Sequence, residues 1–174
     1  MAKGTDETPE AVEKWFKKLP YKKEKVTKLR VFLHEKGNGN GINQTAYVVA
    51  QSNISSTSNS SFGFVSMIDD ILREGAEPDS PIVGRAQGLM GSCSLEETTL
   101  IMSFTFVFTT GKYNGSSISI LGRNPLPNEY RELPIVGGSG VFRLARGVIT
   151  TRTIMFNVTS LYIIAEYELL VFHY

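Results

Sequence analysis

The sequence is poor in the residues that most catalytic and metal sites need. Its 174 residues include one cysteine, Cys93, and two histidines, His34 and His173. A single cysteine cannot form an intrachain disulfide, and no G-x-S-x-G motif or cluster of Cys and His is present. We therefore expect no catalytic triad and no metal, and nothing indicates another cofactor.

Net charge and long apolar runs are also scarce. A formal charge of +1 gives no standing attraction to nucleic acid or to an anionic membrane. No apolar run reaches the length of a membrane span. The glycine-rich segment 137–140 is followed by a strand-type sequence, whereas a phosphate site needs a helix N-terminus. We expect neither nucleic acid nor a membrane among the partners.

The sequence does contain many Gly, Ser, Thr and Phe residues and short runs in which apolar residues alternate with polar ones. These runs cover 26–34, 45–51, 62–68, 82–90, 100–108, 116–121, 142–153 and 161–172. Gly84 and Gly88 allow the curvature that closes a sheet. We predict an all-β fold, an eight-stranded antiparallel up-and-down β-barrel over residues 26–174.

Residues 1–25 are predicted to form a separate N-terminal segment with a short amphipathic helix at 10–19. Trp15 and Phe16 lie on its apolar side, and lysines lie on the other. The lysines could anchor the helix to a membrane surface or a cell wall. We favour the other interpretation, in which Trp15 and Phe16 pack on the outside of the barrel.

The stretch 122–147 concentrates turn residues and pairable charges. Its prolines exclude a helix, and its glycines precede the run 142–153, so we predict a long ordered loop that leads into a strand. Loops of this length in a compact domain are often functional. Asn124 and Arg131 are its candidate site residues.

The expected barrel interior is lined by Phe and aliphatic side chains, which suits a pocket for a flat aromatic ligand. Glu35 shares the parity of Leu33, so its carboxylate enters this interior if the strand continues that far. Burial would raise its pKa and allow proton exchange near neutrality. Two alternatives stay open: Glu35 as a solvated strand-end acid, and Arg131 in a surface salt bridge with Glu132.

Two further features concern the strand runs. Asp69 and Asp70 follow the run 62–68, and we interpret them as turn or salt-bridge residues because no nearby His or Cys completes a metal site. In the run 100–108 both faces are apolar enough to be partly buried. One face would line the interior, and the other would pack against another subunit.

Five N-x-S/T sequons indicate a secreted glycoprotein. Their asparagines are Asn43, Asn53, Asn59, Asn114 and Asn157. The polar segment after Met1 cannot be a signal peptide. We expect a secretion signal to have been removed ahead of it.

Four sequence blocks carry a family resemblance. LHE at 33–35, MIDD at 67–70, VGRAQG at 83–88, and GRNP with YRE and IVGGSGVFRLARG between 122 and 147 occur in the order typical of the plant dirigent family, which this sequence resembles. The resemblance implies extracellular, eight-stranded barrels that assemble into homotrimers. It also implies a phenoxy radical or quinone methide as ligand, with a laccase or peroxidase as the radical source.

Residue by residue, the resemblance covers only part of the family site. Glu35 and Arg131 match its pocket acid and arginine, but Asn124 replaces a second acid. Met90 belongs to a segment that replaces a tyrosine-bearing one, and Tyr162 matches an aromatic lining position. Together with Phe104 and Phe106, Met90 and Tyr162 are expected to contact the substrate.

Two functions follow from the resemblance. The first is a non-oxidising protein that directs stereoselective phenoxy-radical coupling or quinone-methide capture in lignan-type biosynthesis. The second is that of the pterocarpan synthases, which dehydrate an isoflavanol through a quinone methide. The G-R-N-P turn is similar to the branch that includes the pterocarpan synthases.

Overall fold

The computed structural model describes residues 6–37 and 43–174, and the first five residues of the predicted N-terminal segment lie outside this range. Its helix is α1 (Pro9–Lys18), and short 3-10 turns cover Leu19–Tyr21, Gly111–Tyr113 and Gly140–Phe142. The strands are β1 (Lys25–Lys36), β2 (Ala46–Ala50), β3 (Val65–Arg73), β4 (Ile82–Ser92), β5 (Thr99–Phe108), β6 (Ser117–Pro125), β7 (Arg131–Ser139), β8 (Arg146–Asn157) and β9 (Tyr162–His173).

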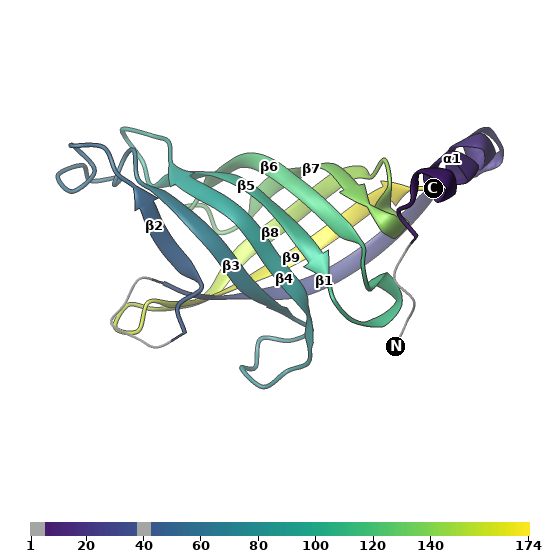
Figure 1. The fold of residues 1–174 in the computed structure, drawn as a ribbon. Coiled ribbons are helices and arrows are strands. Elements are labelled where there is room, and N and C mark those ends of the chain that lie inside the picture. The colour runs from purple at the N-terminus through teal and green to yellow at the C-terminus, as the bar shows by residue number, and fades with distance from the viewer. Residues whose placement is uncertain (1–5, 38–42) are drawn as a thin grey trace.

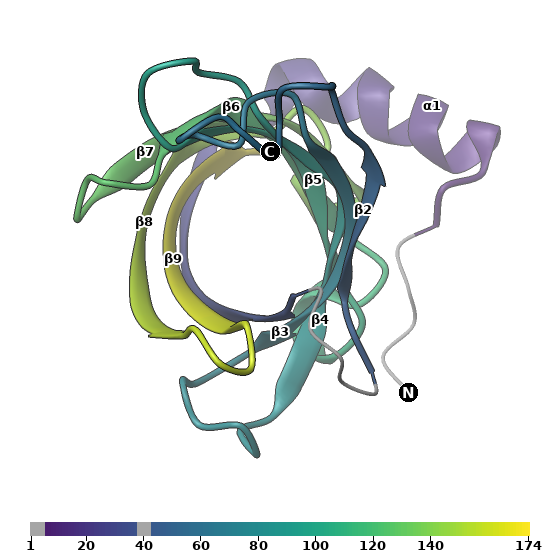
Figure 2. The same cartoon turned by 90° about the vertical axis from the view of Figure 1, so that its left-hand side faces the viewer.

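The strands form a closed antiparallel barrel, which confirms the predicted fold class (Figure 2). Neighbouring strands pair in the order β1-β9-β8-β7-β6-β5-β4-β3-β2. The ring closes where the end of β1 pairs with β3, with Phe32 opposite Arg73. β2 pairs with the other half of the same β3 edge, with Ala46 opposite Ile68. The barrel wall therefore has eight strand positions, one of which β1 and β2 share.

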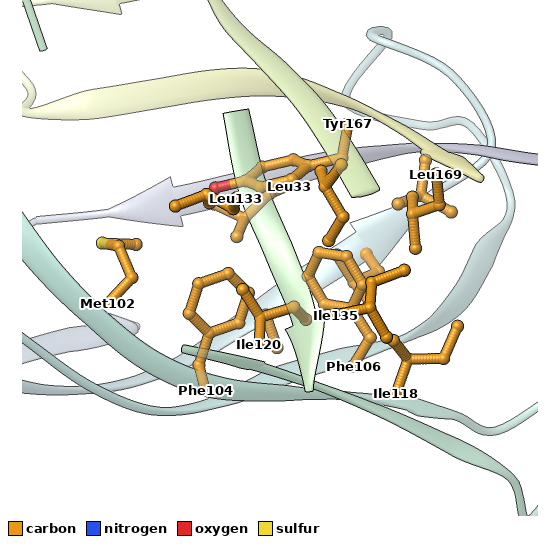
Figure 3. Packing of buried hydrophobic residues seen from close by; sticks show 14 of the residues in the cluster. Leu33, Met102, Phe104, Phe106, Ile118, Ile120, Leu133, Ile135, Tyr167 and Leu169 are labelled. Atoms are coloured by element: carbon orange, nitrogen blue, oxygen red, sulfur yellow. The ribbon is translucent and has the colours of Figure 1, made fainter. Parts of the chain in front are cut away.

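The barrel is filled by apolar side chains, as the alternating runs predict (Figure 3). Phe106 on β5 is fully buried, and its ring meets the rings of Phe104 and Tyr167 at centroid distances of 5.3 Å each. Gly84 lies where an added Cβ would stand 2.1 Å from the carbonyl oxygen of Val107, so this position of β4 requires a glycine beside β5.

The predicted long loop at 122–147 is wrong. The stretch contains the end of β6, the whole of β7 and the start of β8, joined by a tight turn at 126–130. Pro134 is tolerated inside β7 because the pairing with β6 runs only from Ser139 to Ile135, so its missing N–H falls beyond that ladder. The prolines therefore mark a strand end and a partly unpaired strand.

The N-terminal helix forms as predicted but does not pack on the barrel as expected. α1 begins after Thr8, whose side chain accepts a hydrogen bond from the Ala11 N–H. None of its residues is buried, and Phe16 is 62% exposed. Trp15 is half-buried, and its ring meets the guanidinium of Arg143 and the amine of Lys22. α1 projects from one end of the barrel (Figure 1), and no helix of the described residues is long and apolar enough to cross a bilayer.

Candidate functional site

A cavity of about 340 Å³ opens inside the barrel, where β1 ends and β9 begins. These ends of β1 and β9 lie at the barrel end opposite α1 (Figure 1). Most of the wall of this inner cavity is aliphatic or aromatic. The lining residues are Leu33, Glu35, Ile68, Asp70, Met90, Leu100, Met102, Asn124, Leu126, Arg131, Thr153, Phe156, Ile163, Ala165 and Tyr167. The predicted interior pocket is therefore present, with few polar groups in an apolar wall.

Glu35 lies in this cavity because β1 continues to Lys36, so the alternation of inward Val31 and Leu33 extends to it. Burial raises the pKa of the Glu35 carboxyl to about 7. The solvated strand-end interpretation is therefore wrong, and Glu35 can exchange a proton near neutral pH.

Asp70 is a second acid in the same cavity, although the sequence pattern had indicated a turn or salt-bridge residue. β3 does not end at Ile68 but continues to Arg73, so Asp70 takes the next inward position and is fully buried. Its neighbour Asp69 points outward and pairs with Arg85 as expected. Burial, and then the charge of Glu35, raises the pKa of Asp70 to about 8. The cavity thus contains two coupled acids and not one.

The hydrogen bonds of Asp70 differ between its two oxygens. The Thr45 hydroxyl donates to Oδ1 at 2.5 Å and itself accepts the Lys36 backbone N–H at 2.8 Å. Oδ2 is buried and has no hydrogen-bond partner among the described residues. Because Oδ1 is engaged as an acceptor, the proton of the neutral carboxyl belongs on Oδ2.

Arg131 and Asn124 meet at the opposite wall, brought together by the turn between β6 and β7. Both are buried, and the Arg131 Nε–H donates to Asn124 Oδ1 at 3.0 Å. Nη2 donates to the Thr153 hydroxyl at 3.0 Å, and Nη1 donates to the carbonyls of Asn128 and Glu129 at 3.4 Å each. These bonds occupy four of its five N–H groups and leave one Nη2–H for a ligand.

The structure excludes the surface salt bridge with Glu132, which was the other interpretation of Arg131. Glu132 is the next residue of β7 and is exposed on the outer face. Arg131 makes no ion pair with a described residue. Burial lowers the pKa of its guanidinium, but arginine stays protonated in proteins. Its positive charge therefore faces the cavity without a carboxylate partner.

The four expected substrate contacts divide into three groups. Met90 lines the inner cavity. Phe104 and Phe106 are packed deeper in the core and are not among the lining residues, whereas Tyr167, which contacts both rings, lines the cavity instead (Figure 3). Tyr162 lines a different cavity outside the barrel wall, because it has the opposite parity on β9 from Ala165 and Tyr167.

The arrangement by itself defines a class of site. A mainly apolar cavity with two acids of raised pKa and one guanidinium without an ion-pair partner can accommodate a phenol-sized molecule and move protons on it. The described residues contain no group of three His, Cys, Asp or Glu that could hold a metal ion. The fold and site together define a closed barrel with an inner cavity suited to a small molecule and to acid–base chemistry.

Known proteins are similar to this chain in fold and in sequence. A family model described as Dirigent-like protein matches residues 26–172. Dirigent protein 23 of Arabidopsis thaliana is 45% identical over 87% of this chain and 80% of its own length. Pterocarpan synthase 1 of Glycine max is 41% identical over 90% of this chain and 83% of its own. The solved structure of the pterocarpan synthase dirigent protein GePTS1 matches with a TM-score of 0.80 at 40% identity, covering 87% of this chain and 92% of that one.

The chain belongs to the dirigent-like family. The matched segment begins at the second residue of β1 and includes every strand of the barrel. The resemblance seen in the sequence blocks is thereby confirmed for the family and for the fold.

Proposed function

We propose that the inner cavity forms and captures a quinone methide, and that the protein dehydrates an isoflavanol in the manner of a pterocarpan synthase. The observation that carries this proposal is the pairing of Glu35 and Asp70 in one apolar cavity, with pKa values raised to about 7 and about 8. Two acids with different proton affinities are what a combined base and acid need near neutral pH.

In the first step the hydroxyl on the carbon conjugated with a phenol leaves as water. Asp70 gives its Oδ2 proton to this hydroxyl, and the carbon–oxygen bond breaks. Glu35, ionised, takes the proton of the phenol, whose electrons complete the quinone methide. The free Nη2–H of Arg131 donates to the new carbonyl oxygen and stabilises its partial negative charge.

In the second step another phenolic hydroxyl of the same substrate attacks the electrophilic carbon and closes the ring. Its proton passes to the ionised Asp70, and Glu35 returns a proton to the carbonyl oxygen, which becomes a phenol again. Both acids regain their starting protonation states, and the net change is the loss of one water. The apolar walls exclude bulk water, which would otherwise add to the quinone methide.

The direct test is incubation of the purified protein with a 2′-hydroxyisoflavan-4-ol without oxidant. We expect a pterocarpan product of one handedness, measured by chiral chromatography against a protein-free control. No product above that control, over the full set of stereoisomers, would contradict the proposal.

Stereoselective radical coupling is the second candidate. It is favoured by the 45% sequence identity between this chain and a relative named as a dirigent protein, Dirigent protein 23 of Arabidopsis thaliana. In that role Arg131 would orient a phenoxy radical, and a laccase or peroxidase would supply the radical. The protein alone would then leave coniferyl alcohol unchanged, and it would bias the enantiomer ratio of the coupled products only once laccase is added. A racemic mixture in that assay counts against this role.

We further propose a homotrimer that uses an exposed apolar band on the outer face of β2 to β6. The band consists of Tyr47, Met67, Leu89, Ile101 and Leu121, each between 37% and 53% exposed. Tyr47 stands opposite Met67, which stands opposite Leu89, so the band is continuous from β2 to β4. Leu89 and Leu121 both stand opposite Ser103 of β5, two residues along the strand from Ile101. A monomeric barrel would leave this apolar area in water.

Light scattering after size exclusion is expected to give three times the 19.2 kDa chain mass. Met67→Glu places a charge in the band and is expected to yield monomers, whereas Val148→Glu, exposed on β8 away from the band, leaves the mass unchanged. A wild-type monomer at micromolar concentration contradicts the trimer.

The extracellular, glycosylated state remains a proposal that the surface supports. Asn43, Asn53, Asn59 and Asn157 are exposed, and Asn114 is half-buried. Asn157 accepts hydrogen bonds through Oδ1 from the N–H groups of Thr159 and Ser160, and neither bond uses its amide nitrogen. Peptide mass mapping of protein from a plant host would show which of the five carry sugar.

A further inference from the structure

A second and larger cavity lies on the outside of the barrel wall, where β1, β3 and β9 meet the loop 74–81. This outer cavity measures about 760 Å³. It is lined by His34, Lys36, Gly37, Asn43, Gln44, Thr45, Ile71, Arg73, Pro78, Arg85, Ser160 and Tyr162. The reaction proposed for the inner cavity uses none of their side chains as acid, base or donor to substrate.

The lining of the outer cavity is rich in polar and positively charged side chains. It includes Lys36, Arg73 and Arg85 but no carboxylate. Arg85 is paired with Asp69. Arg73 donates to the carbonyl of Ser80, and neither it nor Lys36 has an ion-pair partner among the described residues. Glu77 acts on His34 from beside the cavity but pairs with neither cation. The cations of the lining therefore favour an anionic ligand.

A buried histidine fixes the hydrogen-bonding direction of Tyr162. His34 is 3% exposed, and its Nε2 lies 3.1 Å from the Gly75 carbonyl, which can only accept, so Nε2 carries the proton. Burial lowers the pKa of His34 and favours the neutral ring, so the Tyr162 hydroxyl donates a hydrogen bond to Nδ1 at 2.5 Å. The Tyr162 oxygen is left as an acceptor for a hydroxyl of the ligand.

We propose that the outer cavity binds an acidic saccharide, with a uronate carboxylate held by Lys36 and Arg73 and a ring hydroxyl donating to Tyr162. Carboxylate and hydroxyl on one ring match the cations and the acceptor that the cavity presents. The lining has few apolar side chains, in contrast to the inner cavity, so it suits a hydroxylated ring better than a flat phenol. Its volume is large enough for two or three sugar units.

The test is calorimetric titration of unglycosylated full-length protein with trigalacturonic acid and with its methyl ester. We expect the ester to bind at least about tenfold more weakly, because it lacks the charge that Lys36 and Arg73 recognise. Lys36→Gln and Arg73→Gln should each weaken binding of the acid by about tenfold. Lys28→Gln, an exposed lysine on the outer face of the same strand, should change it less than about twofold.

Two further variants test whether the saccharide binds in the outer cavity and not in the inner one. Tyr162→Phe removes the acceptor and should weaken binding by about fivefold, while Glu35→Gln should leave it unchanged because Glu35 lies in the inner cavity. Because Arg73 also holds the loop 74–81 through Ser80, Lys36→Gln is the decisive variant. Absence of binding, equal binding of the ester, equal losses for Lys36→Gln and Lys28→Gln, or a loss in Glu35→Gln would each overturn the proposal.

Discussion

Asp70→Asn is expected to lower the rate of isoflavanol dehydration by at least about 100-fold, the usual contribution of a general acid. Asparagine keeps the size of the side chain and can still accept the Thr45 hydroxyl, but it cannot transfer a proton from the position of Oδ2. Because Asp70 is mainly neutral at pH 7, the neutral amide should preserve the fold. Single-turnover kinetics with chiral product analysis measure the loss.

The rate of dehydration is also expected to depend on pH through both acids. Ionised Glu35 and protonated Asp70 are needed together, so the rate falls below about pH 7 as Glu35 is protonated and above about pH 8 as Asp70 ionises. Because the two carboxyl groups interact, the apparent pKa values of the two limbs belong to the pair and not to either acid alone. Glu35→Gln should remove the base with a similar loss of rate. Thr45→Val removes a hydrogen bond that lowers the pKa of Asp70, so the alkaline limb should move to higher pH.

Asp69→Asn is the matched control, since Asp69 is the adjacent acid on the outward face and is paired with Arg85. Its rate at pH 7 is expected to stay close to that of the wild-type protein. The charge of Asp69 contributes to the raised pKa of Asp70, so the alkaline limb of this variant should move slightly to lower pH. If Asp70→Asn keeps the wild-type rate while Glu35→Gln loses it, Asp70 is not the acid. If Asp69→Asn and Asp70→Asn reduce the dehydration rate by the same factor, the reduction comes from the loss of a negative charge in this region, and the assignment of Asp70 as the acid is wrong.

The barrel was predictable because alternation in strands depends on local sequence. The strand β7 was missed because its Pro134 and its glycines are typical of a loop. Tertiary pairing makes a strand of it: its glycine-containing half pairs with β6, and Pro134 stands opposite Val148 of β8. The predicted number of eight strands around the barrel wall was still correct. The predicted strand at 45–51 is the short β2, which shares one edge of β3 with β1 and so adds no wall position of its own.

The site was predictable only in part. Glu35 could be found because its parity continues from Leu33. The same counting from Ile68 places Asp70 inward, but the strand was expected to end at Ile68, and that end concealed the signal. Tyr162 has the opposite parity from Tyr167 on β9, so the same counting places it on the outer face. It was predicted in the pocket because of the family resemblance. The joining of Arg131 to Asn124 depends on a turn between two strands, which sequence spacing alone does not establish.

The largest expected loss of stability comes from Phe106→Ala. Phe106 is fully buried and packs against the rings of Phe104 and Tyr167, so its removal deletes apolar burial and leaves a cavity that the closed wall cannot fill. Such changes cost about 3–5 kcal/mol of unfolding free energy. For a chain of this length the melting temperature should fall by roughly 10 °C, measured by calorimetry.

Leu170→Ala is the control for that variant, since Leu170 is 45% exposed on the outer face of β9 beside the inward Leu169. It should change the unfolding free energy by less than about 0.5 kcal/mol. Because Tyr167 lines the inner cavity and rests on Phe106, Phe106→Ala should also lower turnover at temperatures where the protein remains folded. Equal stability losses in the two variants would show that the ring cluster does not support the barrel. An unchanged turnover in Phe106→Ala would show that the position of Tyr167 does not depend on the core beneath it.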